Sequence, residues 1–111
     1  MASVLLVIDT QDYRGEKVIF TQKKWKEKVV EHPDLKNATF LKNVKQAIEN
    51  PSEVWPDYSD KRHKRCYYKK YSTNSYVKVV VWFQGNPACV VTAFETNYIK
   101  ETKYPGLRRL K

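Results

Sequence analysis

The chain has 111 residues, which is enough for one folded domain and too few for two. Its 21 lysines and arginines outnumber its 12 aspartates and glutamates, so the net charge is +9. Aromatic residues make up 14% of the chain, which argues against disorder because aromatic side chains supply the buried surface that disordered chains lack. No apolar run reaches the length of about 18 residues that a membrane helix needs.

The N-terminal part of the chain is predicted to form two strands. The apolar run Val4–Ile8 ends at Asp9 and favours a buried strand over residues 3–9. The turn-like segment 12–15 leads into a second strand over 17–20. Because the apolar run is too short for a signal peptide and no basic segment precedes it, we expect a cytoplasmic protein.

Two helices are predicted to follow these strands. Thr21 is a good N-cap for a helix over 22–31, which ends before Pro33 because proline disfavours helical geometry in the residue before it. Asp34 is the expected cap of a second helix over 35–49. The apolar residues of this helix recur at steps of three and four, and they are Leu35, Ala38, Leu41, Val44 and Ile48.

The second half of the chain is predicted to form an antiparallel sheet. A two-residue periodicity marks strands over 63–71, 76–83 and 88–95, which short loops join into a meander. A short strand over 54–58 contains Pro56 and is therefore placed at an edge. We expect an α+β fold in which the two N-terminal helices pack on one face of the sheet, with a short extra N-terminal strand. The other face of the sheet is then free to meet a ligand.

The cysteines and acidic residues give no sign of a metal centre. Cys66 and Cys89 lack the local spacing of a zinc site or a disulfide framework, and we expect two small core residues. The acidic residues are scattered through helices and loops, whereas a metal-dependent nuclease needs several carboxylates together. No metal and no cofactor are therefore expected.

The positive charge points to a polyanion as partner. The segment 61–78 is rich in lysine and arginine and contains no acidic residue. Four tyrosines are interleaved among these cations, namely Tyr67, Tyr68, Tyr71 and Tyr76. Cations neutralise phosphates and aromatic faces stack on unpaired bases, so RNA is the expected partner. An acidic protein or an anionic membrane would attract the same charge, although we expect no membrane partner.

The two histidines, His32 and His63, are compatible with RNA cleavage that needs no metal. Such cleavage requires a base to take the proton of the 2′-OH, an acid to protonate the leaving 5′-oxygen and cations to stabilise the transition state. Histidine titrates near neutral pH and can serve as either the acid or the base. Arg65, Lys69 and Lys78 are candidate ligands for the phosphate.

Five segments follow one another in an order that is similar to a known family. They read IFTQKKWKEKVVEHPDL, VKQAIENPSEVW, RCYYKK, VKVVVWF and CVVTAFETNYIK. In this order they resemble the phage-borne branch of the barnase–EndoU–colicin–RelE-like (BECR fold) nucleases. The resemblance covers residues 17–100 as a nuclease-like core and leaves 101–111 as a basic tail of a single domain over 1–111. It implies a barnase/RelE-like fold of helices followed by an antiparallel four-stranded sheet.

The resemblance also implies an activity and a set of site residues. Members of this family are mostly metal-independent RNases, and they are often toxins held by a cognate antitoxin or immunity protein. The helix-ending His-Pro of the family falls on His32, as acid or base. The threonine of its V-T-A-F motif falls on Thr92, whose hydroxyl would bind the scissile phosphate. The basic strand motif falls on Arg65, Tyr67, Tyr68 and Lys69.

These observations lead to one favoured function and one alternative. We expect a metal-independent ribonuclease, toxin-like or phage-derived, in which His32, Arg65 and Thr92 converge as catalytic residues. The expected RNA-binding residues are Tyr67, Tyr68, Lys69, Lys70 and Lys78. The alternative is a non-catalytic RNA-binding module on the same fold.

Overall fold

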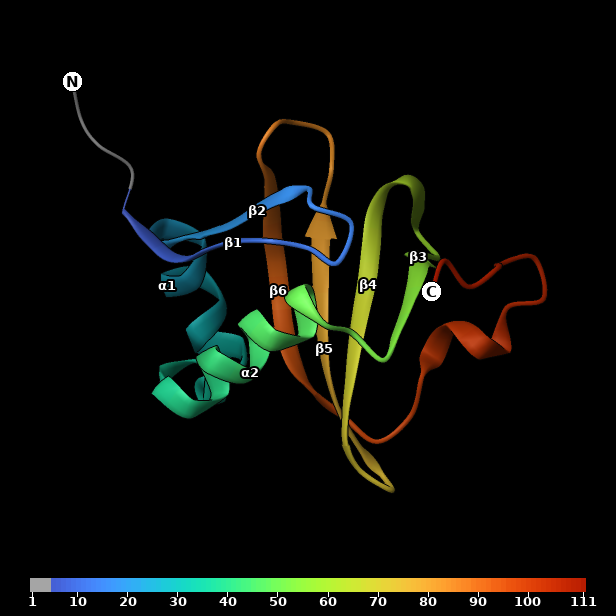
Figure 1. Cartoon of the computed structure of the whole chain (residues 1–111). Helices are drawn as coiled ribbons and strands as arrows, with labels where there is room; N and C mark the ends of the chain where they lie inside the picture. Colours follow the sequence, from blue (N-terminus) through green and yellow to red (C-terminus); the bar gives the residue numbers. More distant parts are fainter. Residues whose placement is uncertain (1–4) are drawn as a thin grey trace.

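A mixed sheet of six strands organises the protein, whose computed structural model describes residues 5–111 (Figure 1). The strands lie in the order β1-β2-β6-β5-β4-β3. Their bounds are β1 (Leu6–Gln11), β2 (Lys17–Thr21), β3 (Glu53–Asp57), β4 (Asp60–Ser72), β5 (Ser75–Trp82) and β6 (Ala88–Thr96). All neighbouring strands are antiparallel except β2 and β6, which run parallel over two residue pairs. The α+β class is therefore confirmed, but the sheet is larger than predicted and is not purely antiparallel.

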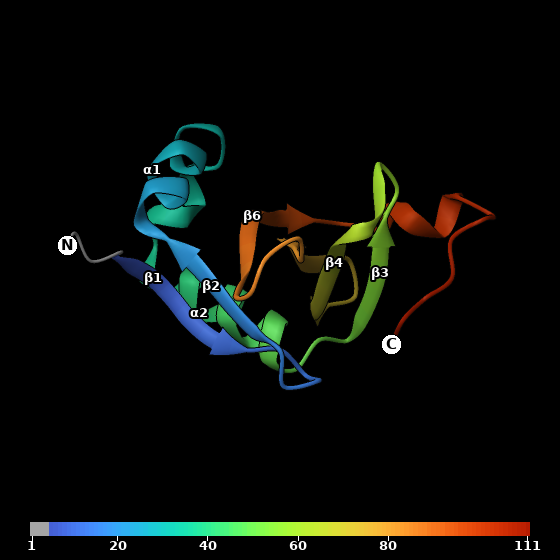
Figure 2. The same ribbon diagram turned by 90° about the horizontal axis from the view of Figure 1, so that it is seen from above.

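The first helix, α1 (Gln22–Glu31), begins and ends as the sequence predicts. The hydroxyl of Thr21 accepts a hydrogen bond from the backbone N–H of Lys24 at 3.2 Å, as an N-cap should. His32 follows the last helical residue, and Pro33 opens a short 3₁₀ helix, η1 (Pro33–Lys36). None of the α1 residues is fully buried, and the helix packs beside β1, β2 and β6 (Figure 2).

The second helix, α2 (Ala38–Glu49), starts three residues later than predicted. The predicted cap, Asp34, lies inside η1, and the side chain of Asn37 caps α2 by accepting hydrogen bonds from Thr39 N and Phe40 N. The 3₁₀ turn keeps Leu35 buried, so the apolar periodicity continues through a break in the helix. The sequence pattern therefore located the buried face only in part: Val44 and Ile48 are buried, but Ala38 is exposed, and the pattern missed Phe40 and Ala47.

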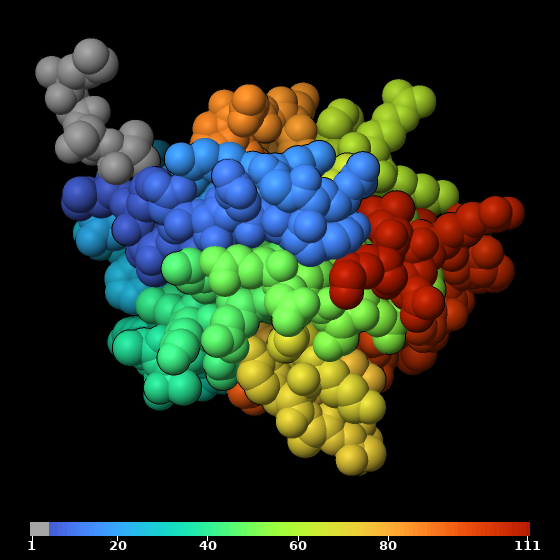
Figure 3. Space-filling view, in the orientation of Figure 1, coloured from blue at the N-terminus to red at the C-terminus, as the bar shows by residue number. Residues whose placement is uncertain are grey.

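One face of the sheet, here called the core face, carries the main hydrophobic core. The core joins residues of α2 such as Val44 and Ile48 to sheet residues such as Tyr67, Val79 and Ala93. The β1–β2 hairpin closes over the same side and lies next to α2 (Figures 1 and 3). The expectation that both helices pack on one sheet face is not confirmed in detail: α2 lies on the core face, and α1, at the side of the β2–β6 junction, packs Trp25 and Val29 against the same core.

The opposite face of the sheet, here called the outer face, carries Tyr68, Lys78, Val80, Trp82, Thr92 and Phe94. Their common side follows from the register, because residues paired across strands share a face and the faces alternate along each strand. Residues 97–111 follow β6 and include a second 3₁₀ helix, η2 (Lys100–Lys103), which places Ile99 against this face. The expectation of an open second face is therefore corrected, because the C-terminal segment covers part of it.

The N-terminal hairpin contains both predicted strands in its described part, but β1 is not the buried strand that was expected, because Ile8 is its only buried residue. Residues 3 and 4 of the predicted 3–9 strand lie outside the described residues, and β1 continues to Gln11. Gly15 occupies the turn with φ +85°, a conformation that glycine adopts without steric cost. The pairing of β2 with β6 brings this hairpin into the same sheet as the meander of the second half.

Two further expectations concern the cysteines and the membrane. Both cysteines are free thiols, with Cys66 buried on the outer-face side and Cys89 half-buried. Burial strongly raises the pKa of the Cys66 thiol, which keeps it protonated and unreactive. Within residues 5–111, no helix is long and apolar enough to cross a membrane.

Candidate functional site

His32 lies on the outer face, at the point where α1 ends. Its imidazole ring stacks on the ring of Phe94 in β6, with centroids 5.0 Å apart and planes inclined by 18°. The backbone N–H of His32 bonds to Lys28 O at 2.8 Å and closes the last turn of the helix. The side chain remains half-exposed. The imidazole is thus held by one aromatic contact while part of it faces solvent.

Lys78 lies on the same face, directly opposite Phe94 across the β5–β6 pair, so that His32 and Lys78 both contact the Phe94 ring. Its Nζ atom lies 3.2 Å from Glu101 Oε1, 5.8 Å from the centre of the Phe94 ring and 5.4 Å from the centre of the Tyr68 ring. Glu101 comes from η2 and is only 1% exposed. The result is a nearly buried cation between two aromatic faces, with its charge balanced by one carboxylate.

Tyr68 completes this cluster by donating its hydroxyl proton to Glu101, with oxygen–oxygen distances of 2.6 and 2.9 Å. Burial and the Glu101 carboxylate both raise the pKa of Tyr68 well above its ordinary value. The phenol therefore stays a neutral hydrogen-bond donor. We refer to Tyr68, Lys78 and Glu101 as the Lys78 cluster.

Thr92 lies on the same face, one residue row from Lys78. Its hydroxyl oxygen is buried and, within residues 5–111, finds no hydrogen-bond partner. A β-bulge lies at this point, because Val80 pairs with Thr92 while Val81 pairs with Val90, leaving Val91 as an extra residue. Bulges often re-aim side chains next to functional sites, and a buried hydroxyl without a partner is costly unless a ligand or water satisfies it.

Arg65 does not join His32 and Thr92, so the expected convergence of the three residues is wrong. Arg65 pairs with Val81, whereas Thr92 pairs with Val80, and successive residues of β5 point to opposite faces. On the core face, Arg65 lies 4.4 Å above the ring of Phe83 and 3.4 Å from a carboxylate oxygen of Glu16. The guanidinium therefore ties β4 to the β1–β2 turn.

The two tyrosines expected to stack on bases are both fully buried. Tyr67 belongs to the core face and donates its hydroxyl proton to Asp12 at 2.7 Å, whereas Tyr68 belongs to the Lys78 cluster. Burial and the bond to Asp12 raise the pKa of Tyr67 above its ordinary value. Neither ring has a free face, so this geometry offers no surface on which either tyrosine could stack a base.

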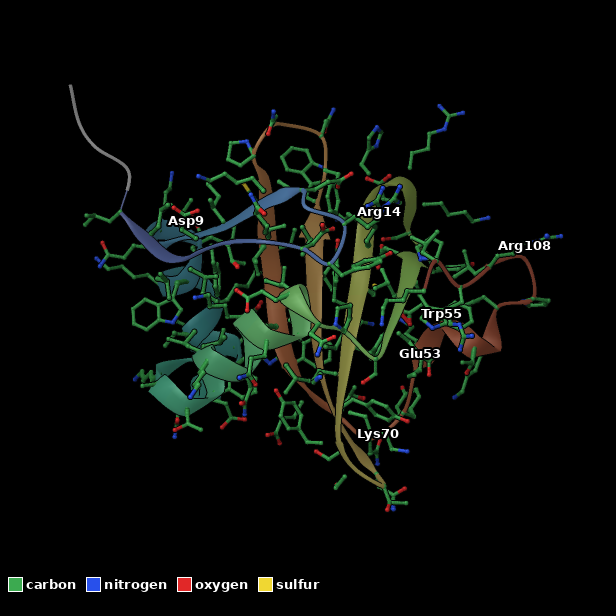
Figure 4. The ribbon with its side chains drawn as sticks, viewed as in Figure 1. Asp9, Arg14, Glu53, Trp55, Lys70 and Arg108 are labelled. Atoms are coloured by element: carbon green, nitrogen blue, oxygen red, sulfur yellow. The ribbon has the colours of Figure 1, made fainter. Side chains whose placement is uncertain are left out.

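The remaining expected RNA-binding lysines are divided between the two faces. Lys69 shares the core face with its partner Val77, and its Nζ atom donates to Asn50 O at 3.0 Å. Lys70 shares the outer face with Tyr76 and is exposed near the end of β4, where Figure 4 labels it. Of the five residues expected to bind RNA, Tyr68, Lys70 and Lys78 thus lie on the outer face, and Tyr67 and Lys69 lie on the core face.

The second histidine is engaged elsewhere. His63 Nδ1 lies 3.1 Å from Asp60 Oδ1 near the start of β4, and the backbone N–H of His63 bonds to the same carboxylate. It therefore does not provide a partner for His32. Within the described chain, no group of three or more His, Cys, Asp or Glu residues is placed so that it could hold a metal ion.

Sequence reasoning missed Glu101 and Phe94, which shape the site. Phe94 was visible as an aromatic residue two positions from Thr92 on the same strand, and this spacing places both on one face. No pattern in the sequence identifies Glu101 as the partner of Lys78, because the contact joins η2 to β5 through the tertiary fold.

Comparison with known proteins identifies the family. A family model described as phage-Barnase-EndoU-ColicinE5/D-RelE like nuclease2 matches residues 9–109. Comparisons with curated proteins and with solved structures give no match. The matched segment contains every strand except the first three residues of β1, and it contains all residues of the outer-face site. The chain therefore belongs to this family of barnase–EndoU–colicin–RelE-like nucleases.

Proposed function

We propose that this nuclease is a metal-independent ribonuclease that cleaves RNA by attack of a 2′-OH on the adjacent phosphate. The observation that carries the proposal is that the His32 imidazole and Lys78 both contact Phe94 on the outer face, two residues along β6 from Thr92. This reaction needs a proton-transfer group, a cation and a hydrogen-bond donor around one phosphate. These residues supply all three.

In the proposed reaction the 2′-oxygen forms a bond to phosphorus as its proton is removed. The bond between phosphorus and the 5′-oxygen breaks, and that oxygen receives a proton. The products are a 2′,3′-cyclic phosphate and a free 5′-OH, with no change in oxidation state. His32 exchanges a proton with either the attacking or the leaving oxygen, because an imidazole can accept or donate at neutral pH.

Lys78 and Thr92 stabilise the phosphate in this scheme. The ammonium group of Lys78 has three N–H donors, and it pairs with one carboxylate, that of Glu101. A donor left over can bond to a non-bridging phosphate oxygen, and the unpaired hydroxyl of Thr92 can donate to another. Charge-assisted bonds of this kind are most effective where they meet the charge that develops in the transition state.

The proposed partners follow from the charge. RNA is the substrate, and Lys70 extends the positive potential along the outer face beyond Lys78. For a toxin-like or phage-derived RNase in the cytoplasm, a cognate antitoxin or immunity protein with an acidic surface would compete for the same positive potential.

The test is incubation of the purified protein with total tRNA and mRNA in the presence of EDTA. We expect cleavage that persists in EDTA and yields 2′,3′-cyclic phosphate ends, and we expect the His32→Ala variant to lose it. Cleavage that EDTA abolishes and Mg²⁺ restores would contradict the proposed mechanism. RNA binding without cleavage under all conditions would favour the alternative of a non-catalytic RNA-binding module.

A further inference from the structure

Trp82 is an exception within the central strand of the sheet. β5 lies between β4 and β6, and residues 77–81 of this strand are all buried. Trp82 follows them on the outer face and is 39% exposed. A large aromatic residue on a central strand would ordinarily pack under a covering element, so its exposure calls for a physical reason.

The three tryptophans of the chain differ in how their indole groups are used. Trp25 donates its Nε1–H to Leu35 O at 2.8 Å, and Trp55 donates to Glu53 Oε1 at 3.1 Å; Figure 4 labels both residues of the latter pair. Within the part of the chain that the structure describes, the Nε1–H of Trp82 has no such partner. Two tryptophans therefore serve the fold, and Trp82 keeps both a ring surface and a donor available.

The surroundings of Trp82 match a nucleotide in charge and spacing. Lys64 lies directly opposite Trp82 on β4, and the exposed cation Arg62 lies two residues before it on the same face. Trp82 and Val80 are two residues apart, which corresponds to about 7 Å along a strand. Val80 is the partner of Thr92, so Trp82 lies one same-face residue row from Thr92 along the sheet, a backbone spacing comparable with one extended nucleotide step.

We propose that Trp82 is a stacking platform for one base of single-stranded RNA, next to the phosphate held at Thr92 and Lys78. Lys64 contacts the phosphate of that nucleotide. This inference rests on the proposed ribonuclease function and adds a second subsite to it. The occupant is single-stranded because only unpaired bases expose a face for stacking, and the preference among bases is weak because every base has such a face.

The experiment measures binding separately from cleavage. A short fluorescein-labelled RNA with 2′-O-methyl groups throughout cannot be cleaved by 2′-OH attack, and its Kd is measured by fluorescence anisotropy. For Trp82→Ala we expect Kd to rise about tenfold or more, the size expected for loss of one base–aromatic stack. Trp82→Phe keeps an aromatic face and should stay within a few-fold of the wild type.

The matched control is Tyr71→Ala. Tyr71 is 42% exposed, close to Trp82 in exposure, but its hydroxyl donates to Asn43 O of α2 and thus lies on the core-face side. This variant should bind like the wild type. In addition, an unlabelled copy of the oligonucleotide should quench the tryptophan fluorescence of the wild type much more than that of Trp82→Phe. Thermal unfolding of each variant verifies that it is folded.

The outcomes separate this inference from the function on which it rests. Unchanged Kd for a folded Trp82→Ala variant, or an equally weakened Kd for Tyr71→Ala, would overturn the stacking subsite while RNA cleavage by the wild type still supported the ribonuclease. If Trp82→Ala fails to fold, the quenching comparison with Trp82→Phe decides, and equal quenching overturns the inference. A wild type that neither binds the oligonucleotide nor cleaves RNA would overturn both.

Discussion

The side chain of His32 makes few contacts with the rest of the fold. Its backbone ends α1, but its imidazole makes one stacking contact, with Phe94, and is half-exposed. Arg65, by contrast, contacts Glu16 and Phe83 and links separate elements of the fold. The two residues were expected to share a catalytic role, yet their surroundings differ because Arg65 points to the core face, whereas His32 contacts Phe94 on the outer face.

Replacement of His32 by alanine should lower the rate of RNA cleavage by about 10²–10⁴-fold, the range typical for loss of a positioned proton-transfer group. The thermal unfolding midpoint should change little, because the substitution removes only one half-exposed ring that stacks on Phe94. The measurement is single-turnover cleavage of a defined RNA. His63→Ala is the control and should retain activity, since His63 pairs with Asp60 away from the outer face. Equal activity of both variants would remove His32 from the mechanism.

Tyr67 and Tyr68 predict an alkaline limit of stability. The fold raises both pKa values, so above about pH 10 the unfolded chain loses these protons while the folded chain keeps them. The unfolded state then binds fewer protons, and the free energy of unfolding falls as the pH rises, by up to about 1.4 kcal/mol per pH unit for each tyrosine. Denaturant titrations at increasing pH measure this slope.

Tyr67→Phe should reduce that slope by the share of one tyrosine. At neutral pH it should also destabilise the protein by about 1–3 kcal/mol, because the buried Asp12 carboxylate loses a hydrogen bond. Tyr98→Phe is a suitable control, since Tyr98 is 49% exposed. An unchanged alkaline slope in Tyr67→Phe would show that the phenol titrates freely in the folded state.

At the scale of elements, the sequence predicted where helices and strands occur better than it predicted which sheet face their residues occupy. α1 agrees with its predicted range, and β4, β5 and β6 each agree within a few residues, because caps, prolines and two-residue alternation are local signals. The predicted start of α2 was too early because Leu35 belongs to the 3₁₀ helix η1. Leu35 is buried there although it is not part of α2. Reading RCYYKK as one motif joined residues that a strand sends to opposite faces.

Asn37→Ala should test where α2 begins. The side chain of Asn37 accepts hydrogen bonds from Thr39 N at 2.8 Å and Phe40 N at 3.2 Å. Loss of such a cap should lower the free energy of unfolding by about 1 kcal/mol, measured by urea denaturation. Asn37→Asp keeps the acceptor and should retain stability. Asp34→Ala, at the cap position predicted from the sequence, should cost less than Asn37→Ala, and the reverse order would contradict this assignment.

The link between η2 and β5 is accessible to a double-mutant cycle. Glu101→Gln and Lys78→Met should each destabilise the protein by about 3–5 kcal/mol, since each leaves a buried group without its charged partner. The double variant should cost clearly less than the sum of the two, with a coupling energy of at least about 1 kcal/mol. Strict additivity of the two free energies of unfolding would mean that the ion pair does not fasten the C-terminal segment to the outer face.

For the whole molecule, the net charge of +9 predicted a polyanionic partner but not the surface that meets it. The fold distributes the cations of β4 over both sheet faces, with Lys64 and Lys70 on the outer face and Arg65 and Lys69 on the core face. The interaction of Glu101 with Lys78 was beyond sequence reasoning, because it depends on how residues 97–111 return to the sheet. Local patterns thus predicted elements, whereas the site arises from their tertiary arrangement.

The division of cations between faces predicts a selective effect on salt dependence. Lys64→Ala combined with Lys70→Ala should weaken RNA binding and make the logarithm of the binding constant less sensitive to salt, by about 0.7 in slope for each phosphate that is no longer neutralised. Lys42→Ala on the exposed side of α2, combined with Lys36→Ala, removes the same charge from elsewhere. Equal changes in slope for the two double variants would indicate that net charge alone, without a defined face, attracts RNA.

The parallel pairing between β2 and β6 has a consequence for how the chain folds. Only two residue pairs make it, Val18 with Ala88 and Ile19 with Cys89, yet it joins segments that are distant along the chain. The hairpin that it anchors supplies Ile8, Val18 and Phe20 to the core that α2 and the meander share. Until these chain-distant segments meet, the apolar residues of α2 and of the meander remain exposed to water, because the β1–β2 hairpin does not yet cover them. Closing such a long loop is entropically costly and is rewarded only when the core forms, which favours a single cooperative folding transition over stepwise assembly.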